Sequence, residues 1–245
     1  MTVYRARKGQ VSYGEAIGIL LLDTHIPFPP GDVGNATTFS FPVRYRVVEG
    51  ASIERLINQR DPTLLQPFIT AGWELIKEGV KAITGDCGFM ILFQEQLASE
   101  FNVPVFMSSL LQLPFISRML RAGEKVGVIT ADSRNLAHQH LEAAGVTDFA
   151  SVRVAGMQDQ VHFYQAILDE KGGLDFEKVE AEVVQVAKNL VAGDEKIKAI
   201  LLECSDLPPY AASVQEAVNL PVFDYTTMIN YVFSALVRKR FHGYL

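Results

Sequence analysis

The sequence predicts an α/β fold of two pseudo-symmetric lobes, each a parallel sheet flanked by helices, with a ligand site in the cleft between them. Two observations carry this prediction. Continuous apolar runs of strand length alternate with longer amphipathic stretches, which is typical of parallel sheets covered on both faces. The second half of the chain also repeats motifs of the first. The 245 residues are enough for two compact lobes.

The elements follow from these runs in order. In the first half, strands are predicted at 15–22, 41–48, 81–84 and 103–108, and helices at 64–79, at 89–101 and from the end of the fourth strand to about Arg121. In the second half, strands are predicted at 125–130, 151–156, 198–204 and 221–225, and helices at 133–145, 175–193, 209–220 and 227–240. Gly79 and Gly193 are placed as helix stops and Ser133 as a helix N-cap.

Two motifs recur in the same order in both halves. Gly-Glu-x-x-Gly occurs at 14–18 and again at 123–127. The chain has only two cysteines, Cys87 and Cys204, and each lies six residues after a Lys-Ala-Ile lysine and seventeen before a Pro-Val-Phe proline. This spacing predicts an internal duplication. The alternative is that all βα units look alike.

Composition and charge indicate which classes of binding partner to expect. The formal charge of −6 argues against a nucleic-acid partner, because phosphate binding depends on clustered Lys and Arg. The basic run at 237–245 suits the exposed end of a helix. No apolar stretch is long enough for a signal peptide or a membrane helix. We therefore expect a cytoplasmic protein with free thiols, which binds neither a membrane nor nucleic acid.

Both cysteines are expected at the carboxyl end of a parallel strand, directly before a helix. Ligands bind at this edge in open α/β sheets. The N–H groups at the helix start would stabilise a thiolate and lower its pKa from about 8.5, and they could donate hydrogen bonds to a substrate carboxylate. Across one cleft, one of the thiols of Cys87 and Cys204 could remove a proton from a carbon while the other delivers one to the opposite face. The alternative is that both are inert buried cysteines.

Other chemistries find less support in the sequence. Two cysteines this far apart lack the paired spacing of zinc ligands, and the five histidines contain no H-E-x-x-H pattern, so no metal site is expected. The histidines at 138 and 140 are interpreted as part of a solvated helix face. The glycine-rich segment 31–35 has neither the G-x-G-x-x-G pattern nor the lysine of a P-loop. Nucleotide binding is therefore not expected.

Four further side chains are candidates for substrate binding. Arg44 and Arg46 share a strand face and could bind a distal carboxylate, or they could be an exposed pair on an edge strand. Asn35 lies in the loop expected over the cleft, where turn chemistry alone would also explain it. Ser108 ends a predicted strand and could line the cleft or cap the next helix.

This arrangement resembles the aspartate/glutamate racemase superfamily, whose members have two pseudo-symmetric α/β lobes with one catalytic cysteine each. The stretch LLECSDLP is similar to that family's second motif, a strand followed by Gly-Cys-Thr and a helix start containing proline. The resemblance implies that Cys87 and Cys204 are the acid/base pair and that no cofactor is needed. It also implies that Ser205 holds the substrate carboxylate, and that Asp206 stands where glutamate racemases have a histidine that assists the cysteine.

The sequence also departs from the family pattern. Gly88 and Phe89 follow the first cysteine, where many amino-acid racemases have Asn and Thr that hold the substrate. Glu203 replaces a glycine before the second cysteine, and a long loop at 23–42 replaces a short one. We expect Gly88 and Phe89 to line the substrate site, but a two-thiol site is better supported than an amino-acid substrate.

The function expected from these features is that of a racemase, an isomerase independent of pyridoxal phosphate, which acts on a small carboxylate such as aspartate, glutamate or a related compound. The alternatives are a one-thiol isomerase or decarboxylase of the same superfamily, or a non-catalytic small-molecule-binding protein. The resemblance also implies a homodimer, and lobes formed by 1–118 together with 225–245 and by 119–224.

Overall fold

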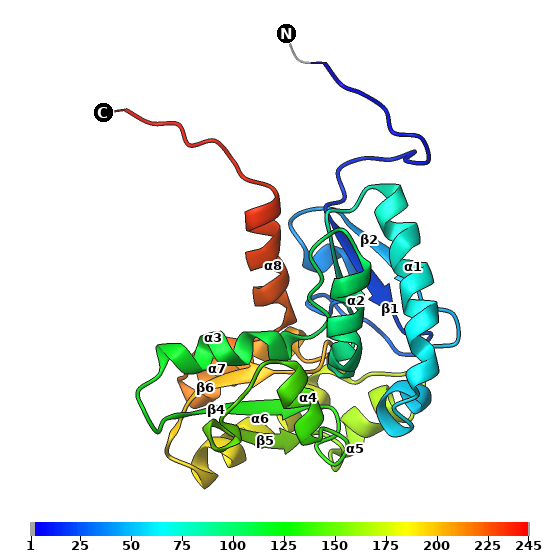
Figure 1. Cartoon of the computed structure of the whole chain (residues 1–245). Coiled ribbons are helices and arrows are strands. Elements are labelled where there is room, and N and C mark those ends of the chain that lie inside the picture. The colour runs from blue at the N-terminus through cyan, green and yellow to red at the C-terminus, as the bar shows by residue number, and fades with distance from the viewer. Residues whose placement is uncertain (1–2, 245) are drawn as a thin grey trace.

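Two separate parallel sheets form the centre of the chain, in a computed structural model that describes residues 3–244 (Figure 1). The first sheet has the order β2 (Val43–Val47), β1 (Ile17–Leu21), β3 (Ala82–Gly85), and the second has the order β5 (Val152–Gly156), β4 (Lys125–Thr130), β6 (Ile197–Leu202), β7 (Val222–Phe223). All the strand pairs are parallel. The predicted fold class is confirmed.

The two sheets have the same strand order, apart from one position. The segment predicted as a strand at 103–108 forms only an isolated parallel bridge, between Val105 and Ile83, in the place that β7 takes beside β6. The Pro104 carbonyl and the Phe106 N–H pair with Ile83, but the Phe106 carbonyl, which the next ladder bond would use, accepts from the Thr84 hydroxyl at 2.6 Å instead. On the opposite edge of the segment, the Gln94 side-chain amide satisfies the Val105 carbonyl and the Met107 N–H.

Helices connect the strands. The α-helices are α1 (Leu65–Glu78), α2 (Gln94–Glu100), α3 (Leu113–Met119), α4 (His138–Ala143), α5 (Val161–Phe163), α6 (Phe176–Gly193), α7 (Ala211–Val218) and α8 (Tyr225–Leu236). Short 3₁₀ segments are η1 (Ala36–Thr38), η3 (Pro62–Leu64), η4 (Gly88–Phe93), η5 (Ser109–Gln112), η6 (Phe149–Ser151) and η8 (Pro208–Tyr210). The chain leaves α1 through Gly79, whose φ of 103° is accessible to glycine. Among residues 3–244, no helix has the length and apolar character that crossing a membrane requires.

The repeated Gly-Glu-x-x-Gly motif has a packing reason. A Cβ atom at Gly18 would press on Leu75 of α1, and one at Gly127 would press on Leu190 of α6. Each glycine lies in an inner strand of its sheet, β1 or β4, and lets a helix approach closely. The same contact is therefore built once in each half, as expected for an internal duplication.

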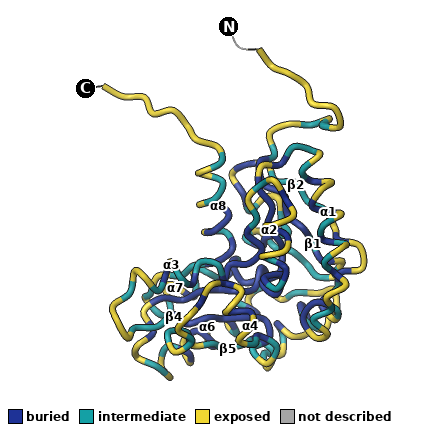
Figure 2. The backbone as a smooth tube through the Cα atoms, in the orientation of Figure 1, coloured by how far each residue is buried: buried dark blue, intermediate teal, exposed yellow. Residues whose placement is uncertain are grey.

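The last helix, α8, packs on the first sheet although it follows the second in sequence. Tyr225, Met228 and Ile229 of α8 share one buried cluster with Ile17 and Ile19 of β1. Figure 1 shows this helix, in red, standing beside the blue strands. The residues before β1 and after α8 are largely exposed and extend away from the body (Figure 2). The exact lobe limits remain a prediction.

Two five-residue π-helices were not predicted. They are η2 (Glu54–Asn58), after β2, and η7 (Tyr164–Leu168), after β5. Each is followed two residues later by a non-glycine residue with positive φ, Arg60 at 51° and Glu170 at 48°. The two halves thus carry the same irregular turn at the same place, and π-turns of this kind occur frequently at functional sites.

The helix predicted at 133–145 is shorter, and α4 begins only at His138. Asp132 explains the delay, because its side chain accepts from the backbone N–H of Arg134 and from the Asn135 amide and so fixes a turn. Ser133 is therefore not an N-cap. The interpretation of the two histidines as solvated is correct for His138, which is exposed, and wrong for His140, which is fully buried.

Candidate active site

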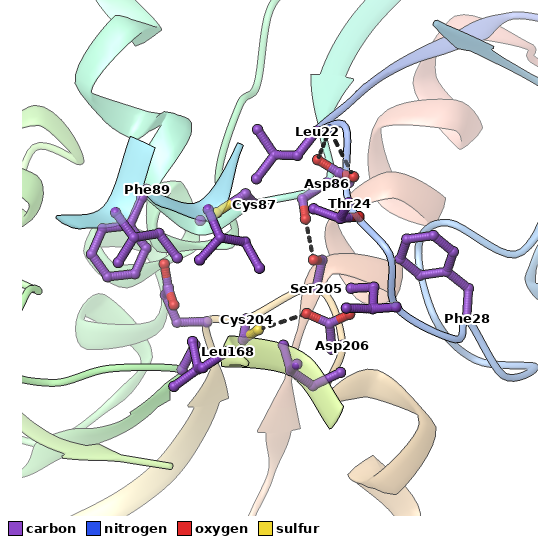
Figure 3. Close-up of a pocket in the computed structure, with 17 residues that line it drawn as sticks. Leu22, Thr24, Phe28, Asp86, Cys87, Phe89, Leu168, Cys204, Ser205 and Asp206 are labelled. Atoms are coloured by element: carbon purple, nitrogen blue, oxygen red, sulfur yellow. Dashed lines mark hydrogen bonds between the residues drawn. The ribbon is translucent and has the colours of Figure 1, made fainter. Parts of the chain in front are cut away.

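A small cavity of about 30 Å³ lies where the carboxyl ends of the two sheets face each other (Figure 3). The two sheet ends contribute 86–89 and 203–206, and the rest of the lining is Leu22, Thr24, Ile26, Phe28, Ile53, Ile57, Ala131, Ile167 and Leu168. A volume of this size holds about one or two water molecules. The reacting groups are thus enclosed mainly by apolar side chains.

The two strands place the cysteines equivalently. Cys87 lies two residues beyond the end of β3, and Cys204 lies two residues beyond the end of β6. Both line the cavity, from opposite sides, as Figure 3 shows. The structure therefore brings together the two thiols that the sequence singled out. β6 itself ends before Cys204, so the predicted strand at 198–204 was slightly too long.

The electrostatic surroundings of the thiols differ from the expectation. The backbone N–H of Phe89 points at the Cys87 sulfur and that of Asp206 at the Cys204 sulfur, and each of these contacts lowers the pKa of its thiol. Burial is the larger effect and raises the pKa of both thiols well above the ordinary value. The predicted lowering of the thiol pKa was therefore wrong. Both cysteines are thiols at neutral pH until a base removes the proton.

Only one of the two thiols has such a base. The Sγ of Cys204 donates a hydrogen bond to Oδ2 of Asp206 at 3.1 Å, and both residues are buried. Within residues 3–244, Cys87 makes no comparable bond to a carboxyl group. The site is therefore symmetric in the position of its sulfur atoms and asymmetric in their chemistry.

Buried carboxyl groups surround the thiols. Asp86, Glu203 and Asp206 line the cavity, and burial is the first cause that raises the pKa of each. Asp86 accepts the Leu22 N–H through both oxygens, at 3.1 and 3.2 Å. Glu203 accepts from Thr130 Oγ1 at 2.7 Å, and its pKa is raised to about 7. The thiols and these carboxyl groups are the ionisable groups of the lining, which contains no Lys, Arg or His.

Two serines join the halves beneath the site. Ser109 Oγ approaches the carbonyl oxygens of Leu202 and Glu203 at 3.2 and 3.1 Å. Ser205 Oγ donates to the carbonyl oxygen of Asp86. The resemblance gave Ser205 the role of holding a substrate carboxylate through its hydroxyl and N–H. Its hydroxyl proton is engaged in this contact between the halves.

The remaining candidates from the sequence are divided. Gly88, Phe89, Ser205 and Asp206 line the cavity. Asn35 and Ser108 are not among the lining residues. Their side chains cap η1 and η5 instead. Arg44 and Arg46 form ion pairs with Glu15, Glu74 and Glu78. Those arginines therefore have a structural role in the first lobe.

The sequence reasoning missed Asp86 and the apolar residues over the site, and it noted Glu203 only as a departure. One signal could have found both acids. An acidic residue stands directly before each cysteine, Asp86 before Cys87 and Glu203 before Cys204, at the strand end where ligands bind.

Comparison with known proteins shows the fold of this chain and identifies its curated relatives. The family model described as Asp/Glu/Hydantoin racemase matches residues 111–229. Among solved structures, a variant of arylmalonate decarboxylase matches with a TM-score of 0.62 at 13% identity, over 90% of this chain and 92% of that one. An allantoin racemase from Pseudomonas fluorescens matches with a TM-score of 0.60 at 17% identity, over 91% of each chain. These likenesses show the fold.

Curated relatives are closer in sequence. The chain is 38% identical to "Dimethylsulfoniopropionate lyase" of Durusdinium sp. clade D, over 85% of this chain and 71% of that protein. It is 36% identical to "Dimethylsulfoniopropionate lyase 3" of Emiliania huxleyi, over 91% of this chain and 60% of that protein. The chain thus spans about three fifths to seven tenths of the length of these relatives. They are lyases, so the expectation of a racemase, and of an isomerase in general, was wrong. The alternative of a one-thiol decarboxylase in the same superfamily fits them better.

Proposed function

Because the chain belongs to the aspartate/glutamate racemase superfamily, and within it to the family of the dimethylsulfoniopropionate lyases, we propose that it is a lyase that cleaves dimethylsulfoniopropionate or a close sulfonium carboxylate. This substrate carries a carboxylate at one end and a positively charged sulfonium at the other. Cleavage by elimination needs one base, which removes a proton from the carbon next to the carboxylate. The C–S bond then breaks, its electron pair leaves with sulfur, and the products are dimethyl sulfide and acrylate.

The observation that carries this proposal is the charge of the lining. The ionisable lining groups are two thiols and the carboxyl groups of Asp86, Glu203 and Asp206. A bound cation would favour the ionised forms of these acids, and their negative charge would in turn offset the cost of burying a sulfonium. An anionic substrate without a positive group would not favour the ionised forms of these acids and would gain no attraction from them.

Cys204 is the base in this proposal, because it alone has a carboxylate partner. The thiol proton moves from Sγ to Oδ2 of Asp206, which lies 3.1 Å away. The resulting thiolate takes the proton from the substrate carbon. The leaving dimethyl sulfide is neutral and needs no acid, so the reaction requires one thiol rather than two. A positioned base of this kind contributes about 10²–10⁴-fold to a rate.

The substrate carboxylate would lie near the start of the helical run at 88–100. N–H groups at a helix start have no partner within the helix and favour negative charge. As the proton leaves the carbon, negative charge develops on this carboxylate, and N–H groups aimed at it lower the barrier. Gly88 and Phe89 keep their predicted place beside the substrate in this arrangement. A homodimer and a cytoplasmic location remain predictions.

The experiment incubates the purified chain with dimethylsulfoniopropionate. Headspace gas chromatography measures dimethyl sulfide, and ¹H NMR measures the vinyl protons of acrylate. We expect both products in equal amounts and at a rate proportional to protein concentration. Acrylate without dimethyl sulfide, or neither product above the rate in buffer, would refute the proposal. Aspartate and glutamate in D₂O serve as comparison substrates, and their α-protons should not exchange.

A further inference from the structure

The cavity between the two cysteines is closed in this structure. Its volume of about 30 Å³ holds about one or two water molecules, whereas dimethylsulfoniopropionate is several times larger than a water molecule. Cys87 and Cys204 are both buried as well. Part of the lining must therefore move away before any ligand of that size can reach the thiols.

One edge of the lining is more exposed than the rest. Thr24, Ile26, Phe28 and Leu168 are partly exposed, whereas every other lining residue is buried. The first three belong to the loop at 23–42, and Leu168 is the last residue of the π-helix η7 in the second half. Figure 3 shows Thr24, Phe28 and Leu168 among the side chains around the thiols. Solvent is therefore nearest to the cavity where these two segments meet.

A hydrogen bond joins the two segments at this edge. Oε1 of Glu170, two residues beyond Leu168, accepts the backbone N–H of His25 at 2.8 Å. Within the described part of the chain, no other hydrogen bond connects residues 23–30 to residues 161–175. The His25 ring also lies against the backbone after η7, because a Cβ atom at Gly172 would be 2.8 Å from its Nε2. One polar contact thus holds this edge of the cavity together.

Glu170 is held in an unusual backbone conformation. Its φ of 48° lies in the left-handed region, which residues other than glycine rarely adopt. Two backbone bonds impose it. The N–H of Asp169 donates to the Tyr164 carbonyl at 2.8 Å, and the N–H of Lys171 donates to the Gln165 carbonyl at 3.0 Å. Conformations of this kind raise the energy of the chain and cluster at ligand clamps and switch regions.

The corresponding turn of the first half, η2, is attached more firmly. Ile53 and Ile57, which it contributes to the lining together with its N-cap, are buried. Arg60 donates to the Asn135 carbonyl at 3.1 Å, and the Asn135 amide donates to Oδ1 of Asn58 at 3.2 Å. Two hydrogen bonds therefore hold a buried edge there, whereas one holds the exposed edge beside Glu170.

We propose that the bond between Glu170 and the His25 N–H is the contact that closes the cavity. While it is made, the loop at 23–42 and the end of η7 enclose the thiols and exclude water. When it breaks, the two segments separate and a ligand can reach Cys87 and Cys204. Segments that close in this way commonly control both substrate entry and product release. This inference does not depend on which substrate the chain cleaves.

Modification of the thiols measures the opening, because the only two cysteines of the chain both line the cavity. Methyl methanethiosulfonate is added in excess to the wild type, Glu170→Asn, Glu170→Gln and the control Glu195→Asn, and mass spectrometry follows the mixed disulfides over time. Asparagine tolerates a positive φ, but its side chain is one carbon shorter and loses the bond. Glu195 is an exposed residue between α6 and β6.

The expected rates follow from the strength of the bond. Glu170→Asn should be modified at least about tenfold faster than the wild type, since a hydrogen bond to a charged group contributes at least that factor. Glu170→Gln should lie between the two, because it keeps an acceptor of the same length that makes a weaker, uncharged bond. Glu195→Asn should react at the wild-type rate.

Urea unfolding of each variant gives the fraction of globally unfolded chains, which also expose their thiols. A rate for Glu170→Asn equal to that of the wild type, or one that rises only in proportion to the unfolded fraction, would overturn the closing contact. Glu170→Gly decides the matter if Glu170→Asn does not fold, because glycine adopts this φ without strain. These measurements need no substrate. Their failure would overturn this inference alone, and absence of acrylate from the wild type would overturn the proposed function alone.

Discussion

The carboxyl group of Glu203 occupies the space that a side chain at Gly88 would need. The two residues lie in different halves of the chain and meet beside Cys87. They are also two of the departures from the racemase pattern, in which a glycine precedes the second cysteine and a larger residue follows the first. The two departures are therefore linked: the Glu203 side chain from the second half fills the space that Gly88, in the first half, leaves empty.

This exchange predicts strong coupling between the two positions. Gly88→Ala should destabilise the chain by about 1–3 kcal/mol, the usual cost of overpacking a filled site. In a Glu203→Gly background the same change should cost at least about 1 kcal/mol less, because the space is then free. Urea unfolding of the four forms measures the coupling. Equal costs of Gly88→Ala in both backgrounds would contradict the contact.

Glu203 should also make stability depend on pH. Its pKa is about 7 in the folded chain, against an ordinary value of 4.5, so between these values the folded state binds more protons than the unfolded one. The free energy of unfolding should therefore fall as pH rises through this window, by about 3 kcal/mol from this residue.

The matched variant is Glu203→Gln, which keeps the shape and can still accept from Thr130. Urea unfolding at several pH values from 4.5 to 8 should show that the stability of the wild type, relative to the variant, declines across this range. Asp32, Asp86 and Asp206 have raised pKa values as well and contribute slopes of the same sign in both proteins. A difference between the two proteins that does not change with pH would mean that Glu203 ionises normally.

The two cysteines should not be equivalent. Cys204→Ser should lower the rate of dimethyl sulfide release by about 10²–10⁴-fold, because a hydroxyl is a far weaker base than a thiol that can pass its proton to Asp206. Cys87→Ser should retain at least tenfold more activity than Cys204→Ser, since elimination needs one base. Gas chromatography over a range of substrate concentrations separates kcat from KM. Equal losses in the two variants would indicate a two-thiol mechanism.

Ser109 should contribute to stability across the boundary between the halves. Ser109→Ala removes the contact with the carbonyl oxygens of Leu202 and Glu203, and it should cost about 1–3 kcal/mol because these groups are buried. The control is Ser234→Ala, in which an exposed hydroxyl bonded only within α8 is lost. Thermal unfolding of both variants gives the comparison. A midpoint for Ser109→Ala as high as that of the control would show that the Ser109 contact does not stabilise the boundary between the halves.

Much of the fold could be predicted because its causes are local. Apolar runs predicted every strand among the described residues. They also predicted a strand at 103–108, which forms only one bridge because the Thr84 hydroxyl takes the Phe106 carbonyl through a contact formed only in three dimensions. The matched spacing of Cys87 and Cys204 predicted that they meet. The helix at 133–145 could not be located correctly, because the Asp132 side chain outweighs helical periodicity there.

The chemistry was harder to predict, for two physical reasons. Helix starts do offer N–H groups to both sulfur atoms, but the depth of burial, which the sequence does not reveal, reverses the expected pKa shift. The racemase and lyase reactions also begin with the same proton abstraction, so two thiols in one cleft do not distinguish them. The acids Asp86 and Glu203 beside the cysteines support the proposal of a substrate with a cationic group, and both acids were present in the sequence.

The contacts of Ser109 and Ser205 between the halves affect how a substrate can enter the site and how products can leave it. Ser109 and Ser205 tie one half to the other, so the cavity, which has room for about one or two water molecules, must widen by movement of other lining residues before a substrate enters. The two π-helices contribute Ile57, Ile167 and Leu168 to that lining. Substitutions in these irregular turns should therefore change the rates of substrate entry and product release.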